Sequence, residues 1–340
     1  MPPAERYRAA GVDLNALERA KARIAQAAAS TRTTLARGLV GAFGGMVRVP
    51  ADLKDPTLVM STDGVGTKVL VALRAGRHDT VGEDLVNHSV NDILVHGARP
   101  IAFLDYIAGA HVPTDTLVAL VEGVARGCRT HGMTLVGGET AALPDVYEPG
   151  HYDLAGTIVG VVAEQEALHG DKVAVGDVLV GYAASGLHTN GYSLARRILF
   201  DDLRLGIDAE VTELGGRVSD VLLAVHRSYW KAVQPALPQI HALAHITGGG
   251  IPGNLVRVLP EGCGALVRTA AWPTPAVFSF LQQKGGVSDD EMYRVFNMGV
   301  GMIAVAAPGD ADAVREAARR AGVETWIIGK ATPGKGVTLD

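Results

Sequence analysis

The stretch VMSTDGVGTKVL changes halfway from apolar residues to residues that suit a phosphate and its metal. Asp63 ends the apolar run, and Mg²⁺ in proteins favours one or two carboxylates together with phosphate oxygens. Gly64 and Gly66 let backbone N–H groups turn toward an anion, Thr67 adds a hydroxyl, and Lys68 adds a positive charge. The spacing matches neither the Walker A motif nor GxGxxG, so an ordinary tight turn capped by Asp63 is the alternative.

The stretch VNDILVHG offers a second polar group inside a predicted helix. Asn91 and Asp92 are poor helix formers in this mostly apolar segment, and Asp84 and His88 share their stripe. The group therefore resembles the wall of a metal–phosphate site, although the same side chains could simply face water. Glu139, in LVGGETA, follows a predicted strand, where it is either a turn acid or an acid presented at the strand end.

Two further glycine-rich stretches precede predicted helices, whose N-termini bind anions through unpaired N–H groups. SGLHTNGYS places His188 and Asn190 between glycines, where the histidine is either structural or directed at a ligand. AHITGGG forms a possible phosphate cradle that consists of Thr247, Gly248, Gly249 and Gly250.

Other chemistries are poorly supported. His241 and His245 form an H-x-x-x-H pair, but Ala242 stands where a zinc peptidase carries glutamate. Cys128 and Cys263 are too few for a disulfide framework. The formal net charge of −5 argues against a nucleic-acid partner.

We expect a cytoplasmic protein with reduced thiols and no membrane partner. The first residues, MPPAERYRAAGVDL, show no apolar h-region, and the longest apolar runs, such as LAGTIVGVVA, are about half of a bilayer span.

Strands and helices mix in both halves without the regular alternation of a doubly wound sheet, so we expect an α+β architecture. A chain of 340 residues favours two domains, and the turn-rich stretch EQEALHGDKVAVGD places the boundary near residue 166, giving domains of 1–165 and 166–340. Asp13 is the expected cap of the first helix. Predicted strands cover 57–62, 101–108, 133–138, 152–163, 178–185, 263–270, 301–308 and 325–331. Predicted helices cover 80–99, 114–132, 192–200, 219–237, 252–259, 274–285, 288–297 and 310–322.

Taken in order, these motifs resemble the phosphoribosylformylglycinamidine cyclo-ligase family, the aminoimidazole ribonucleotide synthetases of purine biosynthesis. The resemblance spans essentially the whole chain and rests on GVDL, STDGVGTK, VNDILVHGARP, LVGGETA, YDLAGTIVGVV, SGLHTNGYSLAR, AHITGGG, RVLP, EMYRVFNMGVGM and WIIGKA. It implies two α+β domains, with N-terminal sheets that pair across a homodimer and close a β-barrel. It also implies that ATP and Mg²⁺ bind mainly to the N-terminal domain, and that the small-molecule substrate is formylglycinamidine ribonucleotide.

The resemblance also implies roles for the motif residues. Asp63 and Asp92 would hold Mg²⁺, with Asn91 and Glu139 as further candidates. The phosphates of ATP would be approached by Gly64, Gly66, Thr67 and Lys68. The substrate would face His188 and Asn190, and a phosphate would lie on Thr247, Gly248, Gly249 and Gly250.

Two departures from the family pattern stand out. The family often has lysine in the first helix where this chain has Ala25, so no role of that lysine carries over, although Lys21 lies one turn away and could substitute for it. Gly253 replaces an acid that commonly precedes the asparagine.

Four alternatives remain open. Selenophosphate synthetase would carry a reactive Cys or selenocysteine where GLVGAFGGM has none, and formylglycinamidine ribonucleotide synthetase would bring a glutaminase. Thiamine-monophosphate kinase lacks the GGETA and SGLHTNGYS pattern, and a non-catalytic nucleotide-binding assembly factor would not need Asp63, Lys68, Asp92 and His188 intact.

Overall fold

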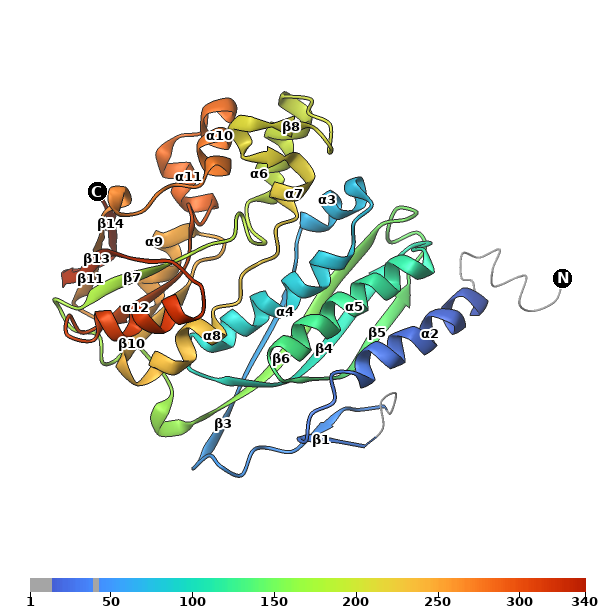
Figure 1. The fold of residues 1–340 in the computed structure, drawn as a ribbon, viewed down its shortest axis with the longest axis horizontal. Coiled ribbons are helices and arrows are strands. Elements are labelled where there is room, and N and C mark those ends of the chain that lie inside the picture. The colour runs from blue at the N-terminus through green and yellow to red at the C-terminus, as the bar shows by residue number, and fades with distance from the viewer. Residues whose placement is uncertain (1–13, 39–42) are drawn as a thin grey trace. The chain divides into compact units, whose positions relative to one another are not determined.

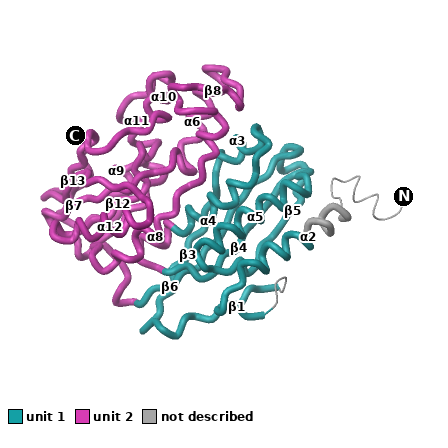
Figure 2. The backbone as a smooth tube through the Cα atoms, in the orientation of Figure 1, with its two compact units in different colours: residues 1–90, 99–163 teal, residues 91–98, 164–340 magenta. Residues whose placement is uncertain are grey.

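The computed structural model describes residues 14–38 and 43–340, with the side chains described from residue 21 onward. The chain divides into two compact units (Figure 2). Unit 1 comprises residues 1–90 and 99–163, and unit 2 comprises residues 91–98 and 164–340. The predicted cap Asp13 lies outside the described residues.

Unit 1 is built on a four-stranded sheet in the order β3-β6-β4-β5 (Figure 1). β6 runs antiparallel to β3 and β4, whereas β4 and β5 are parallel and are joined through the helix α5. The strands are β3 (Pro56–Gly64), β4 (Arg99–Gly109), β5 (Thr134–Ala142) and β6 (Tyr152–Ala163). The helices are α2 (Leu14–Ala29), α3 (Lys68–Ala75), α4 (Asp79–Leu94) and α5 (Thr114–Thr130), and a small ladder joins β1 (Ala36–Arg37) to β2 (Met46–Val47).

The two faces of the unit 1 sheet differ because side chains alternate along a strand. Phe103 and Ile107 of β4 are buried at 0% and 1% exposure. Tyr106 of β4 and Leu58 and Met60 of β3 point to the other face, where they are 40%, 45% and 64% exposed. We call this side, defined by Leu58, Met60 and Tyr106, the open face.

Unit 2 is built on a six-stranded sheet in the order β10-β12-β7-β13-β11-β14. All neighbours are antiparallel except β11 and β14. Both faces of this sheet are covered: Met302 and Ala304 of β12 join one buried cluster, and Ile303 and Val305 join the other. The strands are β7 (Val178–Ala183), β10 (Ile240–His245), β11 (Cys263–Val267), β12 (Val300–Ala306), β13 (Thr325–Pro333) and β14 (Val337–Leu339).

The helices of unit 2 are mostly short. They are α6 (Tyr192–Arg196), α7 (Val218–Leu222), α8 (Trp230–Val233), α9 (Gly250–Leu255), α10 (Ala276–Gly285), α11 (Asp289–Val295) and α12 (Ala311–Arg320). Single-turn elements are η1 (Glu164–Glu166), η3 (Thr212–Leu214), η5 (Val256–Val258) and η6 (Thr269–Ala271); η4 (Gln234–Gln239) is longer, and η2 (Arg197–Asp202) is a π-helix. A short ladder pairs β8 (Glu210–Val211) with β9 (Gly216–Arg217).

The α+β prediction is confirmed, with two corrections. The predicted helix 219–237 is wrong, because α7 ends at Leu222 and α8 begins only at Trp230. The prediction that Glu139 follows a strand is also wrong, because β5 continues to Ala142. Among residues 14–38 and 43–340, no sheet closes on itself and no helix is both long and apolar enough to cross a bilayer.

Candidate functional site

Asp63 lies near the end of β3, and its side chain is 46% exposed. Its two carboxylate oxygens have different neighbours: the Gly64 N–H donates to Oδ1 over 2.6 Å, and Nε2 of His88 lies 2.7 Å from Oδ2. Gly66 follows with φ +57°, a left-handed conformation that glycine adopts at no steric cost. The chain therefore turns directly into α3 and leaves the carboxylate of Asp63 accessible at the strand end.

Lys68, which the sequence analysis placed at the phosphates, has a different partner in the structure. Its Nζ lies 2.8 Å from Oδ2 of Asp84, and both side chains are 0% exposed. Burial lowers the pKa of Lys68, because it disfavours the charged form, and the nearby Asp84 carboxylate opposes this shift. The pair holds α3 to α4 inside unit 1.

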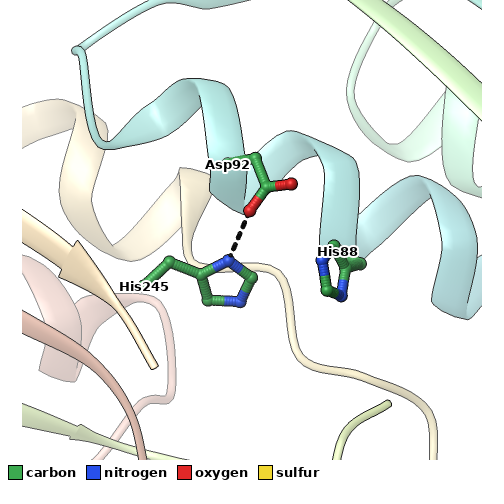
Figure 3. Close-up of side chains that lie close together, drawn as sticks. All are labelled: His88, Asp92 and His245. Atoms are coloured by element: carbon green, nitrogen blue, oxygen red, sulfur yellow. Dashed lines mark hydrogen bonds and ion pairs between the residues drawn. The ribbon is translucent and has the colours of Figure 1, made fainter. Parts of the chain in front are cut away.

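The polar stripe of α4 does not face water, which was the alternative to a site wall. Asp84, His88 and Asn91 are 0%, 3% and 0% exposed. Asp92 keeps 23% of its side chain exposed, and its Oδ1 lies 2.8 Å from Nδ1 of His245 on β10 (Figure 3). Asp92 and His245 both belong to unit 2, and His88 lies one turn earlier on α4.

The SGLHTNG stretch forms the loop between β7 and α6. His188 has φ +62° and is 1% exposed, and its Nε2 accepts a hydrogen bond from the Ser185 N–H over 3.2 Å. A side chain at Gly301 would meet this ring, because an added Cβ would lie 2.4 Å from Cε1 of His188. Asn190 holds a buried Nδ2 that makes no hydrogen bond to any described residue.

The TGGG stretch precedes α9, as predicted, and it is organised by Asn254. Nδ2 of this asparagine donates to the carbonyl oxygens of Thr247, Gly248 and Gly250 over 3.3, 3.2 and 2.9 Å. The two glycine-rich loops are neighbours, since a Cβ added at Gly248 would lie 3.4 Å from Oδ1 of Asn190.

The sequence analysis missed His226, which is 0% exposed. It lies in the segment between α7 and α8, and side chains from elsewhere in unit 2 satisfy the backbone of that segment in place of helical hydrogen bonds. The Ser185 hydroxyl donates to the Val225 carbonyl over 2.6 Å, and Asn91 donates to that of Arg227 over 2.9 Å. These partners are 40 and 136 residues away in sequence, which no local pattern reveals.

Unit 1 also contains a pocket of about 680 Å³ beside α2. Its wall is largely apolar, and its polar side chains include Lys21, Asp105 and Glu139. Ala25, the position where the family often has lysine, lines the same pocket as Lys21. Burial raises the pKa of Asp105 to about 6, because the carboxyl is only 9% exposed.

The raised pKa of Asp105 predicts that stability falls as the pH rises. The folded state favours the protonated acid, so this stabilisation is complete below about pH 4 and is lost as the pH passes through about 6. Asp105→Asn has no such titration. Between pH 4 and pH 8 the wild type should lose up to about 3 kcal/mol of unfolding free energy relative to this variant, at about 1.36 kcal/mol per pKa unit. Urea unfolding at a series of pH values measures the difference, and parallel pH profiles would contradict it.

Family models match both halves of the chain. The N-terminal domain of AIR synthase related protein matches residues 44–162, and its C-terminal domain matches residues 174–340. Solved structures of similar fold include thiamine-monophosphate kinase from Stenotrophomonas maltophilia K279a, at 18% identity and TM-score 0.67 over 95% of each chain. The hydrogenase maturation protein HypE in complex with ATP matches at 19% identity and TM-score 0.64, over 92% of this chain and 88% of that one.

Full-length relatives are considerably closer in sequence. Phosphoribosylformylglycinamidine cyclo-ligase from Sorangium cellulosum (strain So ce56) is 47% identical over 95% of this chain and 94% of its own. The protein of the same name from Anaeromyxobacter sp. (strain K) is 47% identical over 96% of both chains. Given these matches along nearly its entire length, the chain belongs to the AIR synthase related family.

Proposed function

We propose that this protein converts formylglycinamidine ribonucleotide and ATP into aminoimidazole ribonucleotide, ADP and phosphate. The observation that carries the proposal is the 47% identity, over 95% of the chain, to a relative named phosphoribosylformylglycinamidine cyclo-ligase. The described site residues are compatible with this reaction, which needs a nucleotide pocket, accessible carboxylates and a well-ordered substrate loop.

The two steps of the reaction show what the site has to provide. A formamide oxygen is a poor leaving group, so the γ-phosphoryl group of ATP is first transferred to it, and an imidate phosphate forms with release of ADP. The amidine nitrogen of the same molecule then attacks the carbon of this imidate phosphate, and phosphate leaves. Phosphoryl transfer depends mainly on positioning and on neutralising charge, and the intramolecular attack gains from proximity.

Asp63 of unit 1 and Asp92 of unit 2 each suit Mg²⁺, because this ion prefers carboxylate oxygens and retains several waters. Both side chains are partly exposed, and each carboxylate is oriented by a neighbouring imidazole, His88 for Asp63 and His245 for Asp92. Bound Mg²⁺ would supply positive charge to the phosphate oxygens. Lys68, which is buried against Asp84, serves in this proposal to hold α3 in place.

The unit 1 pocket is the proposed nucleotide site. Lys21 and Ala25 lie one helical turn apart on α2 and both line this pocket, so Lys21 can place an ammonium group where the family lysine would place one. Glu139 lines the same pocket. The similar fold of HypE, whose structure holds ATP, supports a nucleotide as the ligand.

The two glycine-rich loops of unit 2 are the proposed substrate side. A buried polar atom normally has a partner, so Nδ2 of Asn190 is available to a ligand. Thr247 to Gly250 would hold a phosphate, and His188 would lie at the reacting oxygen.

We also propose a homodimer formed through the open face of unit 1. Leu58, Met60 and Tyr106 leave apolar surface exposed on one side of a sheet whose other side is buried, and such surfaces commonly mark interaction sites. Pairing of two such sheets would complete the barrel that the family resemblance implies.

The central test of the proposed function is an assay of purified protein with Mg-ATP and formylglycinamidine ribonucleotide. Wild type should form aminoimidazole ribonucleotide. Asp63→Asn should lower kcat by about 100-fold or more, because the proposed Mg²⁺, which neutralises the phosphate charge, loses a carboxylate ligand. Asp153→Asn is a matched control, since Asp153 also accepts a hydrogen bond from the next N–H in the unit 1 sheet. ADP release that ignores the substrate and gives no product would exclude the proposed function.

The nucleotide pocket can be tested by moving one lysine. Lys21→Ala should raise KM for ATP by about 3- to 10-fold, a loss of about 1 kcal/mol of binding. Adding Ala25→Lys to this variant should restore KM, because the ammonium group returns to the same pocket one turn away. Lys54→Ala changes another exposed lysine of unit 1 and serves as control. An unchanged KM in Lys21→Ala would argue against this pocket.

Sedimentation equilibrium tests the proposed homodimer. Met60→Lys places a charge on the open face and should weaken self-association at least about tenfold, at about 1.4 kcal/mol per factor of ten. Val175→Lys, at an apolar position of unit 2 that is 55% exposed, should leave association unchanged. A wild-type protein that stays monomeric at micromolar concentration would rule out the dimer.

A further inference from the structure

The buried side chain of Asn91 has one possible orientation. Its Oδ1 accepts the Tyr229 N–H over 2.9 Å, and its Nδ2 donates to the Arg227 carbonyl over 2.9 Å. Exchanging the two atoms would set a donor against a donor and an acceptor against an acceptor, at a residue that is 0% exposed. The amide nitrogen therefore has a known position.

This orientation determines the tautomer of His226. Nδ2 of Asn91 lies 3.1 Å from Nε2 of His226, and an amide NH₂ group can only donate. Nε2 of His226 is therefore the acceptor, which places the ring proton on Nδ1. Nε2 of His245 lies 3.3 Å from the same atom.

The proton on Nδ1 points toward the loop between β7 and α6. Nδ1 lies 3.3 Å from Oγ1 of Thr189, so His226 donates to that hydroxyl. The His226 ring also stacks on His188, with centroids 4.0 Å apart and planes 21° apart. His226 thus contacts two successive residues of the loop, and His188 holds the strained φ of +62°.

We propose that His226, fixed by Asn91 in the Nδ1–H form, is a positioning residue that orients His188 and Thr189 for the cyclisation. The proposal rests on the proposed function for its catalytic part, whereas the tautomer follows from unit 2 alone. It assigns Asn91 a role different from metal or phosphate binding: its amide aligns the segment that carries His226.

Two-bond ¹⁵N–¹H correlation on ¹⁵N-histidine protein measures the tautomer directly. His226 should show a protonated-type Nδ1 and a bare Nε2, with the signal assigned by its loss in His226→Phe. Thr189→Val and Thr189→Ser should both retain this pattern, because Asn91 and not Thr189 fixes the tautomer. A protonated Nε2 in wild type would overturn the proposal, whatever the enzyme's activity.

Steady-state kinetics test the positioning role. His226→Phe keeps a flat ring but loses the hydrogen bonds of both ring nitrogens, and it should lower kcat by up to about 100-fold while KM for ATP stays within about twofold. Thr189→Val should lower kcat about tenfold, and Thr189→Ser should restore it to within about threefold.

The control for these variants is His241→Phe, which changes another hydrogen-bonded histidine of unit 2, paired with Asp177 over 2.8 Å. It should leave kcat unchanged, and unfolding midpoints should show that all variants are folded. Equal kcat for His226→Phe and His241→Phe would overturn the positioning role. A wild type without cyclo-ligase activity would instead refute the proposed function, and the ¹⁵N measurement would still decide the tautomer.

Discussion

A buried amide has to find all of its hydrogen-bond partners inside the protein, and this constraint on Asn91 organises much of unit 2. An unmet polar group away from water typically costs about 1–3 kcal/mol. Asn91 meets its requirement by binding Tyr229, Arg227 and His226, which are all in one segment between α7 and α8. Because Asn91 binds the backbone of that segment, the segment does not form helical hydrogen bonds there, and this places His226 beside Asn91.

The difference between local patterns and contacts remote in sequence explains why the sequence predicted some features and not others. Asp63 was predicted at a strand end because the change from apolar to polar residues in VMSTDGVGTKVL is local, and β3 ends there. His226 was missed because LAVHRSYW has ordinary helical composition, and the groups that break the helix, Asn91 and Ser185, are remote in sequence. The pairing of Lys68 with Asp84 was not predictable from the sequence either, since only the packing of α3 on α4 brings the two side chains together. Most strands of the two described sheets, by contrast, were predicted from apolar runs bounded by glycine-rich turns, although β10 and β14 were missed.

The pocket of unit 1 shows how a departure from a family pattern can be accommodated. A lysine missing at Ala25 would normally cast doubt on any function that needs its charge. On a helix, however, positions four apart share a face, and Lys21 lines the same pocket as Ala25. In the proposed nucleotide site, an ammonium group at either position would therefore reach the same pocket.

The described polar side chains of the proposed site fall into two classes that suit phosphoryl transfer followed by ring closure. Asp63, Glu139 and Lys21 are exposed enough to meet a ligand, whereas Lys68, Asp84 and the rings of His188 and His226 are almost fully buried. The first step of such a reaction requires charge near the phosphates, and the second requires a substrate held in one conformation. Buried networks serve the second requirement because a side chain with all its hydrogen bonds made has few alternative positions. A single tautomer at His226 is the strictest form of that restriction, since a proton on Nε2 would face the N–H of the Asn91 amide.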